Sequence, residues 1–268
     1  MQLLMFTKLM PQRSMVELAR LGRQWQLDGF DLCVRQGHPV SPDRPEELLN
    51  AAGILRDHGL EIGMVTGEGA LLRPEQPGAE ALLAAMDAAN VRLLKLGYFP
   101  FHPDTMNYAD ELARARAAIL SWGPLARRYR VKVCYHTHSN KNLGLNGAAM
   151  AHLLQGLDPQ LFGAYIDPAH LRVEGEDFAM AAAMLKPWLS IVSAKDMTLV
   201  REECNGHGKA TRHLTPAGQG MVNWTQVFDV LRQHQFTGPV TVHCEYAVPQ
   251  EQFDDFARQE AAFFRRFV

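Results

Sequence analysis

The stretch VKVCYHTHS (131–139) sets the pattern on which the fold prediction depends, because a short apolar run ends there in His136 and His138. Three later stretches repeat this pattern and end in acids, amines or further histidines. They are FGAYIDPAH (162–170) with Asp167 and His170, WLSIVSAKD (188–196) with Ser193, Lys195 and Asp196, and GPVTVHCE (238–245) with His243 and Glu245. In a parallel barrel, the C-terminal ends of the strands point into one shared mouth. We therefore expect four separate segments to bring chemically active side chains together.

Short apolar runs alternate with amphipathic helical patterns eight times along the chain. Such alternation indicates βαβ units and a parallel sheet. The expected strands are Leu3–Phe6, Phe30–Val34, Glu61–Val65, Val91–Leu96, Val131–Tyr135, Phe162–Ile166, Leu189–Val192 and Val240–Cys244. No GxGxxG motif follows the first strand, so a dinucleotide-binding open sheet has no support. The sequence predicts a single (β/α)8 TIM-barrel domain over residues 1–268, in the α/β class.

Two long stretches lack a clear helix or strand pattern. Asp196–Gly220 is rich in glycine, threonine and charged residues, and we expect an irregular loop over the barrel mouth. Gly97–Met106 follows the fourth strand and carries several aromatic residues, among them Tyr98 and Phe99. These aromatic side chains either line the pocket or form a small apolar cluster under the loop.

Composition excludes several classes of partner. The net charge of -2 gives no basic excess for nucleic acid, and no apolar run approaches the roughly 18 residues of a membrane helix. The opening segment is too short for a signal peptide. Four cysteines without CxxC spacing, Cys33, Cys134, Cys204 and Cys244, predict reduced thiols in a cytoplasmic protein. Phenylalanines of the last helix (Phe253, Phe256, Phe263, Phe264) either pack on the barrel wall or form a homo-oligomer face.

Side-chain alternation predicts which groups face the lumen, because residues two apart share one face of a strand. His136 and His138 share a face, as do His243 and Glu245. With these faces turned inward, the mouth gathers a mixed-sign set suited to a small polyhydroxylated or anionic substrate. The set is Arg35, His38, Glu68, Lys95, His136, His138, Asp167, His170, Lys195, His243 and Glu245.

Each of these residues also has a purely structural interpretation. A single histidine at a strand end usually satisfies a backbone group. Arg35 and Lys95 also suit salt bridges in the barrel wall, and Lys195–Asp196 suits an exposed ion pair. Two histidines at i and i+2, together with acids that end other strands, favour a functional site.

Five motifs stand in a characteristic order: YHTHSNKNLG (135–144), YIDPAHLRVEG (165–175), SAKDM (193–197), PAGQGMVNW (216–224) and FTGPVTVHCEY (236–246). Their order and spacing resemble the sugar isomerase/epimerase branch of the xylose-isomerase-like TIM-barrel superfamily, which also holds inosose dehydratases and endonuclease-IV-type enzymes. The resemblance spans nearly the whole chain. It implies the same barrel and a small sugar as substrate.

The resemblance also implies one divalent metal, held by a Glu on strand five, an Asp on strand six, a His on strand seven and a Glu on strand eight. Asp167 and Glu245 match two of these places. His136 stands where the strand-five Glu is expected, and Ser193 stands where the strand-seven His is expected. For a ligand set of His136, Asp167 and Glu245, Mn, Co, Zn or Fe is favoured over Mg, which prefers oxygen ligands.

The resulting hypothesis is an isomerase or epimerase of a small sugar or sugar-like hydroxy-ketone, acting through a metal-stabilised enediolate. The expected catalytic residues are His136, His170, Lys195 and Glu245. The expected substrate-binding residues are Arg35, His38, Glu68, Lys95, His138 and His243.

Alternative functions stay open. An inosose-dehydratase-like lyase would share the enolate step and expel a hydroxyl group, and the YHxH motif of strand five supports it. A barrel that kept a sugar pocket but lost part of the metal site would be a non-catalytic binding protein, and Ser193 favours that interpretation. An endonuclease-IV-type phosphodiesterase is disfavoured. The resemblance to such enzymes implies more metal ligands than this sequence offers, and a DNA-binding surface is normally basic.

Overall fold

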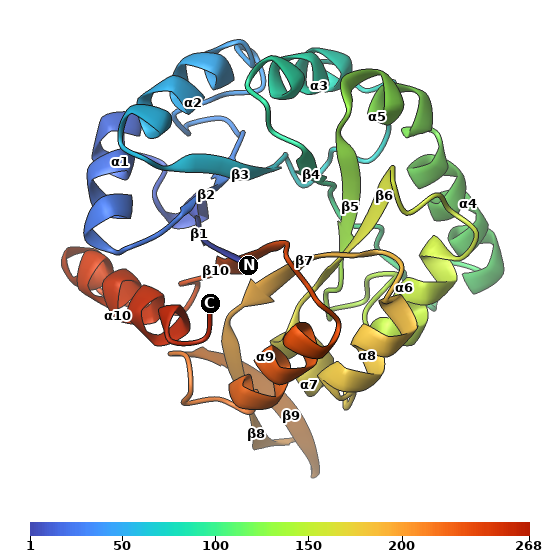
Figure 1. Ribbon diagram of the computed structural model, residues 1–268. Coiled ribbons are helices and arrows are strands. Elements are labelled where there is room, and N and C mark those ends of the chain that lie inside the picture. The colour runs from blue at the N-terminus through green and yellow to red at the C-terminus, as the bar shows by residue number, and fades with distance from the viewer.

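A computed structural model describes all 268 residues, and its eight parallel strands close into a barrel in the order β1-β10-β7-β6-β5-β4-β3-β2 (Figure 1). The barrel strands are β1 Gln2–Phe6, β2 Gly29–Cys33, β3 Glu61–Thr66, β4 Leu93–Lys95, β5 Lys132–His136, β6 Phe162–Ile166, β7 Leu189–Ala194 and β10 Pro239–Val242. All eight expected strands are confirmed. The predicted TIM barrel is therefore confirmed as well.

A ring of helices surrounds the strands (Figure 1). The α-helices are α1 Met15–Gln24, α2 Glu47–Asp57, α3 Ala79–Ala88, α4 Tyr108–Leu120, α5 Gly123–Tyr129, α6 Gly147–Leu154, α7 Pro168–Val173, α8 Phe178–Leu185, α9 Trp224–Gln233 and α10 Phe253–Arg265. Two 3-10 turns, Thr7–Leu9 and Gln250–Gln252, complete the set. None of the helices is both long and apolar enough to cross a membrane.

Local sequence signals explain where helices begin. Ser14 caps α1 in a capping box with Glu17, and the Asn223 side chain accepts the N–H of Gln226 at the start of α9. The continuous helical pattern over residues 108–129 is divided into α4 and α5, because Pro124 begins a new helix at its first turn. The four phenylalanines of α10 are at least partly buried, which agrees with packing on the barrel wall.

Apolar side chains fill two separate regions. The larger core lies between the strands and the helices, and a small cluster fills the barrel interior. That inner cluster consists of Leu4, Met64, Cys134, Tyr165 and Ile191. All four cysteines are free thiols, and Cys204 alone is not buried. These apolar side chains fill the lower lumen, beneath the polar groups that follow the strands.

The prediction of an irregular loop over Asp196–Gly220 is wrong. Most of that segment forms an antiparallel hairpin, β8 Asp196–Cys204 and β9 His207–Thr215, which protrudes beyond the helix ring beside α7 (Figure 1). Asn205 and Gly206 form its tip, both with positive φ. Asn-Gly is the dipeptide that type I′ hairpin turns prefer, so the sequence held a signal for this hairpin.

Asp196 anchors the base of this hairpin and is fully buried, so it is not the exposed partner of a surface ion pair. Its carboxylate accepts hydrogen bonds from the N–H groups of Met197, Gly218 and Val222 and from the indole N–H of Trp224. A Cβ atom on Gly220 would lie 2.0 Å from Asp196 Oδ1. The PAGQGMVNW motif is thereby explained as a loop folded around one carboxylate.

Candidate active site

A cavity of about 200 Å³ opens at the C-terminal end of the barrel. Seven strands, or the residues that follow them, supply its walls. The lining residues are Phe6, Lys8, Arg35, Thr66, Gly69, Lys95, Tyr98, His136, His138, Lys195, His243 and Glu245. Pockets for drug-sized ligands have volumes of roughly 300–1,000 Å³, so this cavity suits a smaller molecule.

Asp167 lies directly behind the cavity, at the end of β6 and the start of α7. Its Oδ1 atom accepts the backbone N–H groups of Ala169 at 2.9 Å and His170 at 3.0 Å, which makes it the helix cap. Its Oδ2 atom lies 3.1 Å from Lys195 Nζ. Burial alone would raise the pKa of this carboxyl, but Lys195 and the neighbouring histidines hold that pKa well below its usual value.

Lys195 joins two carboxylates inside the barrel. Its Nζ atom lies 3.1 Å from Asp167 Oδ2 and 3.3 Å from Glu245 Oε2, and its side chain is 5% exposed. Burial acts to lower the pKa of Lys195, yet the two carboxylates raise that pKa above its ordinary value. Glu245 also pairs with Lys8. Lys195 is therefore a fixed ammonium at the wall of the cavity.

Two histidines turn their Nε2 atoms toward Asp167. His170 Nδ1 lies 2.6 Å from the hydroxyl of Ser139 and also accepts the Ser139 backbone N–H at 3.4 Å, so its Nε2 carries the hydrogen. His136 Nδ1 lies 2.8 Å from the hydroxyl of Tyr98. The Nε2 atoms of His136 and His170 lie 3.4 and 3.8 Å from Asp167 Oδ2. Burial lowers the pKa of both rings well below the usual value, so both are neutral.

His138 carries its hydrogen on the other ring nitrogen, Nδ1. Its Nδ1 atom lies 2.6 Å from the carbonyl oxygen of Ser139, which can only accept, so Nδ1 carries the hydrogen and Nε2 is unprotonated. Burial lowers the pKa of His138 to about 4. Because His138 also lines the cavity, it presents a free lone pair at neutral pH.

His243 is held on three sides. Its ring stacks on Phe6 with centroids 4.4 Å apart, and its Nε2 atom lies 2.7 Å from the hydroxyl of Tyr165. Its Nδ1 atom lies 3.3 Å from Glu245 Oε2 and donates to that carboxylate. His243 and Lys195 therefore orient Glu245 from two directions.

The structure brings together most of the residues expected at the mouth. Arg35, Lys95, His136, His138, Lys195, His243 and Glu245 line the cavity, and Asp167 and His170 lie behind it. Glu68 is exposed and lines a separate surface pocket, because the chain turns outward after β3. His38 is half-buried in the loop after β2 and does not line the cavity.

Sequence reasoning did not identify Lys8, Ser139 or Tyr165 as site residues. Lys8 stands two residues beyond Phe6, so strand alternation carried a signal for it. The aromatic side chains of Gly97–Met106, after β4, were expected either to line the pocket or to form an apolar cluster, and they do both. Tyr98 lines the cavity, whereas Phe99 packs against the core.

The residues present do not fit the divalent metal expected from the resemblance. No group of three or more His, Cys, Asp or Glu side chains is arranged to hold a metal ion. The ammonium of Lys195 lies between Asp167 and Glu245, where it neutralises the carboxylates and would repel a second cation.

The fold and the residues at the barrel mouth match a known family of barrels. The family described as xylose isomerase-like TIM barrel matches residues 18–267. The chain belongs to that family. This confirms the resemblance that the five motifs indicated.

The curated relatives that the chain matches are inosose dehydratases. An inosose dehydratase of Halalkalibacterium halodurans is 25% identical over 130 residues, which are 46% of this chain and 43% of the relative. An inosose dehydratase of Bacillus velezensis is 21% identical over 179 residues, covering 64% of this chain and 59% of the relative. The chain thus spans about half the length of the curated relatives that it matches.

Solved structures cover the chain more completely. A D-psicose 3-epimerase from Clostridium cellulolyticum has a TM-score of 0.74 at 13% identity, covering 100% of this chain and 99% of its own. A probable 3-DHS dehydratase from Bacillus anthracis has a TM-score of 0.73 at 14% identity and covers 99% of both chains. At such identities the likeness shows the fold.

Proposed function

We propose that this protein is an enzyme that removes a proton next to the carbonyl group of a small sugar or sugar-like hydroxy-ketone, as an isomerase or epimerase. One observation carries the proposal: the fixed ammonium of Lys195 and the unprotonated Nε2 of His138 line the same small cavity. Removal of an α-proton needs a base for the proton and a positive group for the charge that develops on oxygen.

His138 Nε2 would accept the α-proton. The Nδ1–H of His138 is already bonded to the Ser139 carbonyl, so the imidazolium formed by proton transfer keeps that hydrogen bond. Lys195 would donate a hydrogen bond to the oxygen that gains charge. Its own charge persists through the reaction because Asp167 and Glu245 stabilise it. No step in this scheme passes through a metal ion.

The other predicted catalytic residues take different roles in this proposal. His136 and His170 turn their Nε2 atoms toward Asp167, so they would position the Asp167–Lys195 pair rather than accept a proton. Glu245 holds the ammonium of Lys195 from the cavity side. Arg35 and Lys8 would bind hydroxyl or anionic groups of the substrate.

A lyase of the inosose dehydratase type is the second candidate, and the names of the curated relatives favour it. Its first step is the same proton removal. The intermediate then expels a β-hydroxyl group in place of regaining a proton at carbon. The two functions therefore share His138 and Lys195 and differ in product.

The test is hydrogen exchange in deuterated water, followed by NMR, with D-fructose, D-psicose, D-tagatose and scyllo-inosose as probes. We expect exchange at the α-carbon of at least one probe, and the product distinguishes epimer from dehydrated ketone. His138→Gln should lower the exchange rate by about 100-fold, the usual contribution of a general base. His207→Gln, in the exposed hairpin, is the matched control and should leave the rate unchanged.

Two results would contradict the proposal. Absence of exchange with every probe, with and without added Mn²⁺ or Co²⁺, would indicate a non-catalytic binding protein. Exchange that appears only with added metal, and that a chelator abolishes, would instead reject the metal-free scheme.

A further inference from the structure

A second buried lysine faces the same cavity in a different state. Lys95, the last residue of β4, is 5% exposed and lines the cavity, yet its Nζ atom makes no hydrogen bond or ion pair. Its Nζ atom lies 4.1 Å from the centroid of the Tyr98 ring, in a cation–π contact. Lys195, by contrast, is paired with two carboxylates. Lys195 is therefore held as a cation by two carboxylates, while Lys95 has only the weaker contact with the Tyr98 ring.

The surroundings of Lys95 favour the neutral amine. Burial, assisted by the positive charges of Arg35 and Lys195, lowers the pKa of Lys95 to about 7, against the opposing effects of Asp31 and Cys33. Asp31 forms no ion pair with Lys95. It accepts a hydrogen bond from Thr66 at 2.7 Å and another from Thr241 at 3.4 Å.

We propose that Lys95 forms a covalent imine with the carbonyl carbon of the substrate. The amine nitrogen attacks that carbon, the carbonyl oxygen becomes a hydroxyl group, and this hydroxyl leaves as water when the C=N bond forms. Hydrolysis at the end of the cycle returns the oxygen and frees Lys95. No oxidant or reductant takes part. The inference rests on the proposed function in one respect, namely that the substrate carries a carbonyl group.

The imine would take the place of the carbonyl oxygen beside Lys195 as the electron sink of the proposed reaction. When the α C–H bond breaks, its electron pair moves into the protonated imine to give an enamine, and the proton goes to His138 Nε2. Tyr98 brings these two groups together, because its ring centroid lies 4.1 Å from Lys95 Nζ and 4.6 Å from the centroid of the His138 ring. A covalent lysine thus replaces the Lewis acid for which this donor set is unsuited.

Borohydride reduction tests the imine directly. The wild-type chain is incubated with dihydroxyacetone or D-fructose, reduced, and analysed by mass spectrometry and peptide mapping. We expect one adduct with the mass of the ketose less one oxygen atom, located on the peptide that contains Lys95. Because mapping uses the wild-type chain, the result does not depend on the folding of a variant. Adduct yield should rise from about pH 6 to about pH 8 as the amine loses its proton.

Variants sharpen the assignment. Lys95→Met should abolish the adduct, whereas Lys132→Met should retain it, since Lys132 stands at the start of β5 at the other end of the barrel. An adduct on Lys195, or one spread over exposed lysines, overturns the inference.

Combined with the exchange assay, the outcomes separate the two proposals. Exchange without an adduct on Lys95 overturns the imine and leaves the proposed function standing. An adduct on Lys95 without exchange supports the imine and overturns the proposed function. Absence of both overturns both.

Discussion

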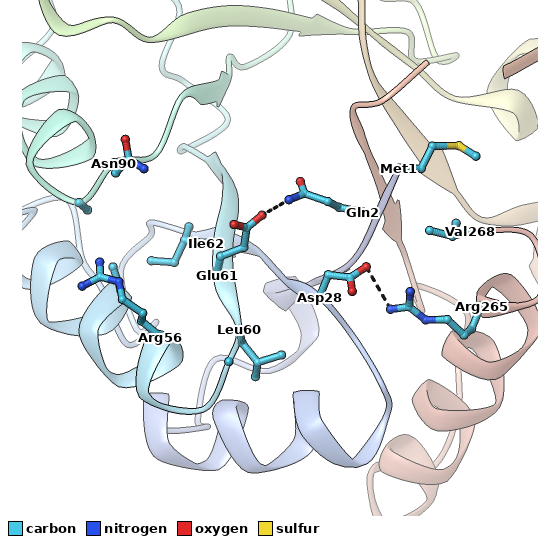
Figure 2. A pocket seen from close by; sticks show the side chains of 13 residues that line it. Met1, Gln2, Asp28, Arg56, Leu60, Glu61, Ile62, Asn90, Arg265 and Val268 are labelled. Carbon is cyan, nitrogen blue, oxygen red and sulfur yellow. Dashed lines mark hydrogen bonds and ion pairs between the residues drawn. The ribbon is translucent and has the colours of Figure 1, made fainter. Parts of the chain in front are cut away.

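The two ends of the barrel contain cavities that differ in kind. The N-terminal end holds the larger one, about 540 Å³, which Figure 2 shows with the Gln2–Glu61 and Asp28–Arg265 pairs at its wall. No histidine or lysine lines it. The C-terminal cavity of about 200 Å³ is lined by three histidines and three lysines. Cavity size therefore does not identify the functional end, whereas the chemistry of the walls does.

An Asp–cation ion pair occurs at each end of the barrel, and the two pairs differ in how far they are buried. The Asp28–Arg265 pair is partly exposed, with side chains 40% and 28% exposed, so water screens it. The Asp167–Lys195 pair is 0% and 5% exposed, and its atoms depend on one another for solvation. The ion pair at the N-terminal end of the barrel is therefore solvated, whereas the charged groups at the C-terminal end are desolvated and reactive.

The largest effect that would test this contrast comes from removing one cation at each end. Lys195→Met leaves the buried carboxylate of Asp167 without its ammonium partner and should destabilise the fold by about 3–5 kcal/mol, with loss of exchange activity. Arg265→Met should cost no more than about 1 kcal/mol. Urea denaturation of both variants measures the difference. Equal losses of stability would show that burial does not distinguish the two ends.

A pH effect should follow from Asp31, which lies within the lumen below the mouth. Burial raises the pKa of Asp31 from 3.8 to about 7, so the folded state holds this proton more tightly than the unfolded chain. Its contribution to stability is complete below the unfolded pKa and is lost as pH rises through about 7. At about 1.4 kcal/mol per pKa unit, the loss is on the order of 4 kcal/mol.

Asp31→Asn should remove that share of the pH dependence and raise stability at pH 8 relative to the wild type. The measurement is urea denaturation across the range from pH 4 to pH 8. Glu260, buried under Ala217, also has a pKa raised to about 7 and contributes a separate share, which Glu260→Gln identifies. An Asp31→Asn curve with the wild-type slope would reject the assignment.

The smallest effects compare two glycines outside the strands, one beside the hairpin anchor and one within α2. Gly220→Ala places a Cβ atom 2.0 Å from Asp196 Oδ1 and should cost about 1–3 kcal/mol through strain in the hairpin anchor. Gly53, within α2, has no atom within 4 Å of its added Cβ. Gly53→Ala should stabilise the protein by about 0.5–1 kcal/mol, because alanine favours a helix. Thermal denaturation compares the two variants. A Gly220→Ala protein as stable as the wild type would show that close packing around Asp196 does not anchor the hairpin.

Strand alternation explains why the barrel and much of the site could be predicted. The period of two fixes the face on which His136, His138 and Glu245 lie, and parallel strand direction fixes the end. The sequence could not predict that Lys195 bridges two carboxylates, because this contact depends on the directions of side chains from three different strands. Glu68 was misplaced because it stands two residues beyond the last residue of β3, where the chain has already turned outward.

The hairpin of β8 and β9 has a consequence for how copies of this chain meet one another. A two-stranded sheet that projects into water has an unpaired strand edge on each side, and such edges invite pairing with a strand of another molecule. Leu199 and Val200 are exposed there and would favour such pairing. The same strands carry Arg201, Glu202, Glu203 and Lys209, all exposed. Because an added strand would have to desolvate these charges, the protrusion is protected against edge-to-edge aggregation.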